Sequence, residues 1–550
     1  MKPKNTLCIA EWQSFGFNEV KQALEANHKI NATLNNSNAE WSETKATITS
    51  EAKAIESKAQ SIFNELVDFT KYEGNHQFLK LIRQNGKDML KAQNYVGLIQ
   101  SKSGFCVEIL PKTFQSIKES NVFQIKNCTC SSLQGSETDK TIQNNVDCHI
   151  NASPHNENLK SQKCKVCQAK QILLNMLKSL KNSPLKHTQF AHLKAQQFPL
   201  LEAFVLMFLD ELESLVKRGI RANYVLKEQN RTFLKGKLLF SQHLKYNLTH
   251  KERFFTASDE FSHNIPENAL IKSTLKLLET LSLSSKTQSK LIQMHFIFAE
   301  IKPSKNIDKD LSRCQNTRHF KVYENILLWC KIFLKRQSFS AYQGNSKAFA
   351  LLFDMNILFE SYVASEMKKY LNDKSYKNGL YDEFVQHILK DSQSDIQKHN
   401  IFIKTQESIK YLAEQDKEKM FRLIPDIVGY TKDNIQQTPQ TFFIADTKWK
   451  LLSQDSQKHY NIDNIAQADI YQIWAYLCKY QCKKGFLIYP APTDSTETNA
   501  KPTPPTFTFK SDVVAFAKNL SEGSKQVTQA DSQNQPKITL YICLFPLSHQ

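Results

Sequence analysis

The chain has 550 residues, a mass of 63.5 kDa and a formal net charge of +18, so it is long enough for two to four domains with a large core. Its longest nearly apolar stretch, Phe198 to Leu209, is interrupted by Glu202 and is far too short to cross a bilayer. The first residues, MKPKNTLCIAEW, lack the apolar core of a secretory signal peptide. We therefore expect a cytoplasmic protein with no membrane partner.

The positive charge is compatible with binding to nucleic acid, because neutralisation of phosphates drives binding that is independent of base sequence. The basic residues are 63 Lys and only nine Arg, however. Arginine is the side chain best suited to grip phosphates and base edges with two parallel hydrogen bonds. The charge therefore permits DNA binding but does not by itself indicate it.

The amino-terminal region begins with a short segment, residues 1–25, followed by residues 26–50, whose Asn, Thr, Ser and Ala content is typical of a linker. Residues 51–72 have the apolar spacing of an amphipathic helix. The stripe consists of Ile55, Ala59, Ile62, Phe63, Leu66 and Phe69. Strands are predicted around residues 94–100 and 105–110.

Residues 115–168 are polar and rich in turn-forming residues, and we interpret them as an insertion in a region made of residues 1–114 and 169–340. Five cysteines gather in the insertion: Cys128, Cys130, Cys148, Cys164 and Cys167. Their Cys-x-Cys and Cys-x-x-Cys spacing is compatible with a structural Zn²⁺ site, because thiolates at such spacing can complete a tetrahedron. The alternative is a disordered loop with reduced thiols.

Helices are predicted over residues 169–218, strands with basic turns over 220–262, and further helices over 266–282 and 319–336. A boundary near residues 340–346 separates this region from a carboxy-terminal domain, residues 341–550. That domain is predicted to end with a strand at residues 538–547.

Two apolar runs in the carboxy-terminal domain carry the most informative residues. The run FRLIPDIVGY contains Asp426, and the run FFIADTKWK contains Asp446 and Lys448. Both are predicted to be strands joined by the polar segment 431–440. Side chains two apart on a strand share a face, so Asp446 and Lys448 are expected to project together beside Asp426. Two carboxylates and an ammonium group at one place suit a hydrolytic Mg²⁺ site.

An acid-x-Lys triplet alone is weak support, because five others occur: Glu43/Lys45, Glu51/Lys53, Glu56/Lys58, Glu300/Lys302 and Glu366/Lys368. None of these follows a Pro-Asp at hairpin distance. Downstream, Gln472 and Tyr476 have helical i, i+4 spacing, and Asp469 lies on the same predicted face. A second pair at that spacing, Gln467 and Tyr471, makes this last signal weak when taken alone.

These residues resemble the PD-(D/E)XK nuclease superfamily and, more narrowly, the McrC family of nuclease subunits in McrBC-type restriction systems. The resemblance extends to several further short segments in the same order. They are Val96–Ile99, Val107–Lys112, Phe233–Leu238, Glu260 to Asn268, Met355–Glu360 and Gly485–Pro490. In total it covers about residues 90–112 and 169–550.

The resemblance implies an α+β multidomain protein, with an amino-terminal α/β region followed by a PD-(D/E)XK nuclease domain in which helices flank a mixed sheet. It implies that Asp426 and Asp446 hold Mg²⁺ with the carbonyl of Thr447, and that Lys448 positions or activates water. Glu360 is expected to complete the metal shell through water, or else to be a solvent-facing acid. Gln472 is expected to orient the nucleophile or the strand backbone. Tyr476 is expected to pack, and Lys450 to contact a DNA phosphate.

The resemblance also implies a partner, an McrB-type AAA+ GTPase that recognises modified double-stranded DNA and on which the amino-terminal region docks. The 13 glycines of the chain form no phosphate-binding loop, so GTP is expected on the partner. Two alternatives remain at this stage. One is a regulatory or assembly subunit with a vestigial nuclease site, and the other is a stand-alone repair nuclease of the same superfamily.

Overall fold

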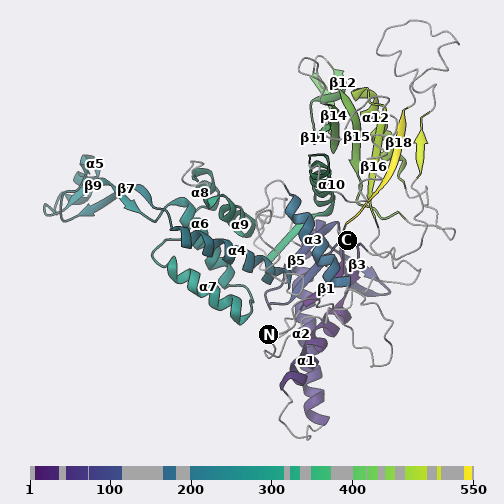
Figure 1. Cartoon of the computed structure of the whole chain (residues 1–550). Coiled ribbons are helices and arrows are strands. Elements are labelled where there is room, and N and C mark those ends of the chain that lie inside the picture. The colour runs from purple at the N-terminus through teal and green to yellow at the C-terminus, as the bar shows by residue number, and fades with distance from the viewer. Residues whose placement is uncertain are drawn as a thin grey trace, which may run out of the picture. The chain divides into compact units, whose positions relative to one another are not determined.

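In a computed structural model the chain divides into two compact units (Figure 1). Unit 1 contains Met1–Ile109, Ile125–Gln168 and Asn182–Phe353, and unit 2 contains Leu110–Gln124, Ala169–Lys181 and Asp354–Gln550. The structure describes residues 6–35, 45–71, 74–113, 165–180, 199–314, 322–334, 349–372, 401–415, 418–431, 440–452, 465–491, 505–509 and 538–547. The predicted boundary at residues 340–346 lies outside these ranges.

The amino-terminal part of unit 1 is an α/β structure. One sheet has the strand order β1 (Thr6–Ala10), β6 (Cys106–Leu110), β5 (Tyr95–Gln100) and β10 (Phe349–Asp354). A second sheet has the order β2 (Ser14–Phe15), β4 (Lys87–Ala92) and β3 (Leu79–Gln84), and η1 (Asn75–Gln77) precedes β3. Helices α1 (Phe17–Asn35) and α2 (Lys45–Lys71) pack against each other.

The core of this part confirms one prediction and corrects another. The predicted stripe of α2 is in contact with the core, and Ile62, Leu66 and Phe69 are buried there. The prediction of a linker from residue 26 was wrong, because α1 continues to Asn35. Apolar residues at the start of α1, such as Val20 and Leu24, bury that helix against α2, and this packing outweighs the weak helix propensity of the Asn and Thr residues that follow.

The rest of unit 1 is a helical group with a projecting arm. The helices are α4 (Leu200–Arg218), α6 (Pro266–Glu279), α7 (Ser285–Ile297), α8 (Ile307–Arg313) and α9 (Glu324–Leu334). The arm, residues 223–262, contains β7 (Asn223–Arg231), β8 (Lys237–Leu238), α5 (Phe240–Asn247) and β9 (Phe254–Ser262), and Figure 1 shows it extending away from these helices. Strands were expected over residues 220–262 and are found there, but helices α5, α7 and α8 were not predicted.

Two buried carboxylates bind helix amino termini in unit 1. Glu108 of β6 is fully buried, and its Oε1 accepts a 2.6 Å hydrogen bond from the Leu200 backbone N–H at the start of α4. Glu202 of α4 likewise accepts hydrogen bonds from Ser284 and Thr287 at the start of α7. A carboxylate is favourable at these positions, because the first N–H groups of a helix lack partners within it and carry partial positive charge.

Unit 2 is built on a mixed sheet of the kind expected for the carboxy-terminal domain. Its strand order is β11 (Ile401–Thr405), β14 (Ile427–Thr431), β15 (Thr441–Thr447), β16 (Lys484–Pro490), β18 (Thr539–Phe545) and β17 (Thr506–Thr508). The pairs β11–β14, β14–β15 and β17–β18 are antiparallel, and β15–β16 and β16–β18 are parallel. The parallel step from β15 to β16 uses α12 (Gln467–Tyr480) as its crossover helix.

Helices lie against the two faces of this sheet. Val428, Ile444 and Leu487 form a core cluster with apolar residues of α12. Residues of the opposite alternation face away from α12, and on that side Tyr362 of α10 (Met355–Asn372) makes an edge contact with Phe545. Asp446 has the same alternation as Ile444, so it is directed to the α12 side.

The run FRLIPDIVGY was predicted to be one strand, and this prediction was wrong. Its first residues end β13 (Glu418–Leu423), which pairs only with β12 (Lys410–Gln415) in a separate two-stranded sheet, and its last residues form β14. Pro425 lies between them. Proline cannot donate to a sheet ladder, so the run is divided there and Asp426 immediately precedes β14.

Most of the cysteine-rich insertion lies outside the described residues, including Cys128, Cys130, Cys148 and Cys164. Cys167 is buried in α3, which begins at Lys165 (Lys165–Ser179). The Zn²⁺ hypothesis therefore stays a prediction. Within the described ranges, no helix is long and apolar enough to span a bilayer.

Gly97 of β5 allows close approach of β10. Its φ is +135°, and a Cβ atom built there would lie 2.1 Å from the carbonyl oxygen of Leu351. We predict that Gly97→Ala lowers the melting temperature strongly, because the unfavourable φ alone costs about 1–3 kcal/mol and a backbone clash is added. Gly74→Ala is the control, since Gly74 also has positive φ, +85°, but no atom lies within 4 Å of the added Cβ. Equal losses in thermal unfolding would contradict the role of close approach.

Candidate active site

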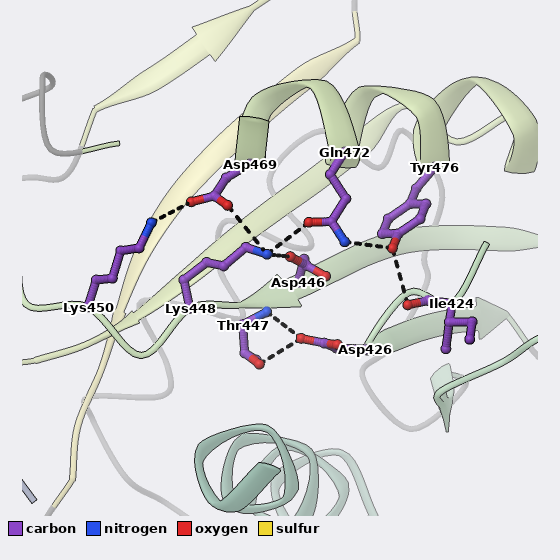
Figure 2. Close-up of polar contacts among 9 residues, drawn as sticks. All are labelled: Ile424, Asp426, Asp446, Thr447, Lys448, Lys450, Asp469, Gln472 and Tyr476. Carbon is purple, nitrogen blue, oxygen red and sulfur yellow. Dashed lines mark hydrogen bonds and ion pairs between the residues drawn. The ribbon is translucent and has the colours of Figure 1, made fainter. Parts of the chain in front are cut away.

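Asp426 and Asp446 lie at the same end of the β14–β15 pair. Ile427 is opposite Ala445 in this antiparallel ladder, so the two aspartates occupy the next position along it. Asp446 is buried, with 2% of its surface exposed. One oxygen of Asp426, Oδ2, accepts 2.7 Å hydrogen bonds from both the backbone N–H and the hydroxyl of Thr447 (Figure 2). The hairpin thus holds two carboxylates together.

Lys448 follows β15 directly and enters this group. Its Nζ lies 2.7 Å from Asp446 Oδ2 and 3.5 Å from Asp469 Oδ1. It also donates a 2.9 Å hydrogen bond to Gln472 Oε1. The backbone N–H of Lys448 donates to the carbonyl of Ile488 in β16, which fixes the start of the side chain. Figure 2 shows the ammonium group among these three partners.

The Gln/Tyr pair of α12 connects Lys448 to the segment that carries Asp426. Gln472 Nε2 donates to the Tyr476 hydroxyl at 2.8 Å, and that hydroxyl donates to the backbone carbonyl of Ile424 at 3.2 Å. Ile424 is two residues before Asp426. Tyr476 was expected only to pack; its ring is buried, but its hydroxyl also joins α12 to this segment.

Asp469 also belongs to the site, because it contacts Lys448. Its sequence spacing predicted the helix face shared with Gln472 but no role in the site. Besides its contact with Lys448, its Oδ2 lies 3.3 Å from Nζ of Lys450. Lys450, which was expected to reach a DNA phosphate, is about half exposed. The three-residue spacing of Asp469 and Gln472 indicated that both lie on one face of the helix. Only the direction of α12 over the sheet shows that Lys448 and Lys450 are the partners of Asp469.

Glu360 of α10 is linked to the aspartates through Gln406. The backbone N–H of Gln406 donates to the carbonyl of Asp426 at 3.0 Å, and its side-chain Nε2 donates to Glu360 Oε2 at 3.0 Å. Glu360 is thus neither a fully solvent-facing acid nor a direct hydrogen-bond partner of Asp426 or Asp446. Its pKa is raised by burial and by the charges of the two aspartates.

The electrostatics of the site are dominated by burial of acidic groups close to one another. Burial, and then the charge of Asp426, raises the pKa of Asp446 to about 7 although Lys448 opposes the shift. Burial also raises the pKa of Asp426, against the hydrogen bonds from Thr447. Burial and the charges of Asp426 and Asp446 raise the pKa of Glu360 to about 8. For Lys448, burial lowers the pKa, but the surrounding aspartates outweigh it and the net shift is upward.

This donor set fits a hard divalent cation. Asp446 Oδ2 is buried, and the ammonium group of Lys448 lies 2.7 Å from it. A divalent cation at the two aspartates would add to this positive charge and favour the ionised carboxylates. No group of three His, Cys, Asp or Glu side chains able to hold a metal occurs among the described residues. Asp426 and Asp446 would therefore supply two ligands and leave the rest to backbone, water or phosphate, as is usual for Mg²⁺.

The raised pKa of Asp446 predicts how the metal-free chain responds to pH. The folded state retains a proton on Asp446 that the unfolded chain releases, so the free energy of unfolding falls as pH rises from about 4 to about 7. Asn resembles the protonated acid at every pH. In EDTA, we expect Asp446→Asn to melt above the wild type at about pH 8, and this advantage to shrink towards about pH 5.

The control for this experiment is Asp68→Asn, which removes an exposed carboxylate of α2 that pairs with Lys71. It should change the melting temperature little at either pH. A melting-temperature difference between Asp446→Asn and wild type that does not depend on pH would contradict the account of the buried carboxylates.

Comparisons with known proteins give two similar solved structures and one matching family model. Two solved structures of assemblies from Thermococcus gammatolerans are similar to the chain. One is a half-complex of McrB AAA+ hexamers with bound McrC, with 13% identity, 98% of this chain and 94% of the other covered, and a TM-score of 0.48. The other is the McrBC complex, with 17% identity, 68% and 89% covered, and a TM-score of 0.37. No curated protein matches the sequence.

The family assignment rests on the sequence itself. The family model of the McrBC 5-methylcytosine restriction system component matches residues 90–490, which include all the site residues described above. This range covers well over half of the sequence, and the chain therefore belongs to the family of McrBC 5-methylcytosine restriction system components.

Proposed function

We propose that this chain is the nuclease subunit of a McrBC-type restriction complex and hydrolyses DNA phosphodiester bonds with Mg²⁺. The observation that carries the proposal is the convergence of two carboxylates and one ammonium group, from Asp426, Asp446 and Lys448, at one end of the β14–β15 hairpin. The sheet order supports a PD-(D/E)XK nuclease fold, in which an antiparallel pair bearing the acids is followed by a helix and a parallel strand.

In this proposal Asp426 and Asp446 would hold the cation. When bound, Mg²⁺ would neutralise charge on the phosphate and promote ionisation of a water molecule. Thr447 keeps Asp426 oriented through its two hydrogen bonds, which leave the other carboxylate oxygen, Oδ1, available. Gln406 would hold Glu360 near the two aspartates, where it would bind a water molecule of the metal shell without displacing either of them.

Lys448 acts in this proposal as a charged group rather than as a base. Its pKa is raised because the nearby aspartates outweigh the effect of burial, so it remains an ammonium group at neutral pH. An ammonium cannot remove a proton from water, but it can orient the water and stabilise the negative charge that develops on the phosphorane. Asp469 and Gln472 hold Nζ in position for this task.

We further propose an McrB-type AAA+ GTPase as the partner, since the family is named for a multicomponent system and this chain has no phosphate-binding loop. The arm of unit 1 is the candidate docking surface. Many large apolar side chains are exposed along it, and exposed apolar surface is typical of protein interaction sites. These residues are Tyr224, Leu226, Phe233, Leu234, Phe240, Leu244, Tyr246, Leu248 and Phe261.

The first test of this function is cleavage of modified DNA by the chain with its GTPase partner in Mg²⁺. We expect Asp446→Ala to abolish cleavage and Lys448→Ala to reduce it by about 100-fold or more, because a preorganised charge at the developing phosphorane is lost. Lys368→Ala removes an exposed lysine of α10 and is the matched control, with unchanged cleavage. Cleavage at the wild-type rate by a folded Asp446→Ala protein would refute the site.

The second test separates the two activities. Asp446→Asn should cut no DNA but should still raise the GTPase rate of the partner, because the arm is unaltered. Leu234→Glu together with Leu248→Glu should abolish this stimulation, since charges would enter an apolar interface. The control is Leu81→Glu, which alters an exposed leucine of unit 1 outside the arm. Full stimulation by the arm variant would show that the partner docks elsewhere.

A further inference from the structure

The hairpin of β12 and β13 stands beside the candidate active site and is anchored at the end nearer to it. Leu423, the last residue of β13, is buried in the core cluster shared with α12. Opposite it, Lys410 donates a hydrogen bond to the carbonyl of Lys479 in α12, and its Nζ lies 4.3 Å from the ring centre of Tyr480. Asp426 follows Leu423 after only two residues. The position of the hairpin relative to the two aspartates is thus fixed by packing.

Beyond this anchor, β13 is exposed on both faces. Its first five residues, 418–422, are all exposed, including Met420 and Phe421. Met420 and Phe421 lie on opposite faces of β13, and neither side chain is buried in a hydrophobic core. The exposed apolar surface extends to Leu412 of the neighbouring strand. Such surface is typical of a binding element.

Phe421 is held in a conformation that its residue type disfavours. Its φ is +55°, and 69% of its surface is exposed. The register is the same on both sides of it, yet Phe421 and Leu412, which would face each other, do not pair. Gly or Asn would adopt this φ more easily, and no burial of the ring compensates for the strain. A strained, exposed aromatic residue near an active site indicates a ligand contact.

Two cations lie near the half-buried ring of Tyr411 on the same hairpin. Lys419 Nζ and Arg422 Cζ lie 5.6 Å and 5.9 Å from the ring centre of Tyr411. Among the described residues, neither cation forms an ion pair with a carboxylate. Arg422 donates one hydrogen bond, to the carbonyl of Ser408, which leaves most of its N–H groups available. Of the two acids of the hairpin, Glu414 lies opposite Lys419 in the ladder and Glu418 precedes Lys419, whereas Arg422 lies opposite Tyr411, nearer the anchored end.

We propose that the β12–β13 hairpin is a DNA-contact element that holds the substrate duplex at the cleavage site. Arg422 and Lys419 contact backbone phosphates, and Phe421 packs against an exposed base face or between base steps. DNA is the occupant that these residues fit, because it combines a dense line of negative charge with flat apolar surfaces. The proposal rests on the proposed nuclease function, since that function places a scissile phosphate beside Asp426.

The test is binding of a fluorescein-labelled duplex to the full chain, measured by fluorescence anisotropy in EDTA, where no cleavage occurs. Phe421→Gly should weaken binding by about 5- to 100-fold, which is the range for loss of one aromatic stacking contact. It should not lower the melting temperature, since glycine adopts positive φ without strain. Phe421→Trp should retain binding. A folding role for Phe421 would give the opposite pattern, with lower stability and unchanged affinity.

The salt dependence of binding tests the cations. Arg422→Ala should reduce the slope of log Kd against log salt concentration by about 1, because one phosphate contact is lost. Lys368→Ala, which removes an exposed lysine of α10 in the same unit, should leave the slope unchanged.

Several results would overturn the proposal. One is unchanged DNA binding by both Phe421→Gly and Arg422→Ala, and another is the absence of DNA binding by the wild-type chain. Unchanged DNA binding combined with loss of GTPase stimulation would assign the hairpin to the protein partner instead. Failure of the proposed function looks different, because the wild-type complex would then bind DNA in Mg²⁺ without cutting it.

Discussion

Two carboxylates buried at the end of one hairpin, Asp426 and Asp446, repel each other, and the rest of the site depends on how this repulsion is balanced. In the metal-free chain the balance comes from a raised pKa and from the ammonium group of Lys448. Neither the raised pKa nor the ammonium group removes the free-energy cost of ionising both acids in a buried site. An added cation would favour the state with both acids charged, and this is the physical basis for proposing a metal-dependent reaction.

Helix α12 organises the site because it contacts both strand ends. Asp469 and Gln472 hold the ammonium group of Lys448, and Tyr476 reaches the carbonyl of Ile424, just before Asp426. One side of a single helix therefore sets the distance between the lysine and the first aspartate. Tyr476 was expected only to pack. Its hydroxyl also links Gln472 to the backbone carbonyl of Ile424.

Sequence reasoning succeeded where a short local rule determined the result. The two-residue spacing predicted that Asp446 and Lys448 lie together, and they do, although Lys448 falls just past the end of β15. The apolar stripe of α2 was enough to identify its buried face. Sequence reasoning failed at Pro425, where a local signal against a continuous strand was given too little weight. The run around Pro425 was predicted as one strand because apolar content outweighed the proline, although a proline inside a strand pattern argues for a break.

Other features needed three-dimensional information. Helix α1 extends past residue 26 because it packs on α2, which no local pattern indicates. The role of Asp469 depends on the orientation of α12 over the sheet. The exposure of Phe421 could not be foreseen either, since its apolar neighbours predict an ordinary buried strand. The first two features depend on contacts between residues that are distant in sequence. The third depends on the absence of any packing that would bury the Phe421 ring.

The central claim is that Asp426 and Asp446 form the site of a catalytic divalent cation. The most direct measurement is an anomalous difference map from crystals of the full chain soaked in Mn²⁺, a substitute for Mg²⁺ that prefers the same oxygen ligands. We expect a peak within bonding distance of one oxygen from each aspartate, and its loss in the Asp446→Asn protein. Absence of a peak there, at a Mn²⁺ concentration that supports DNA cleavage in solution, would contradict the account.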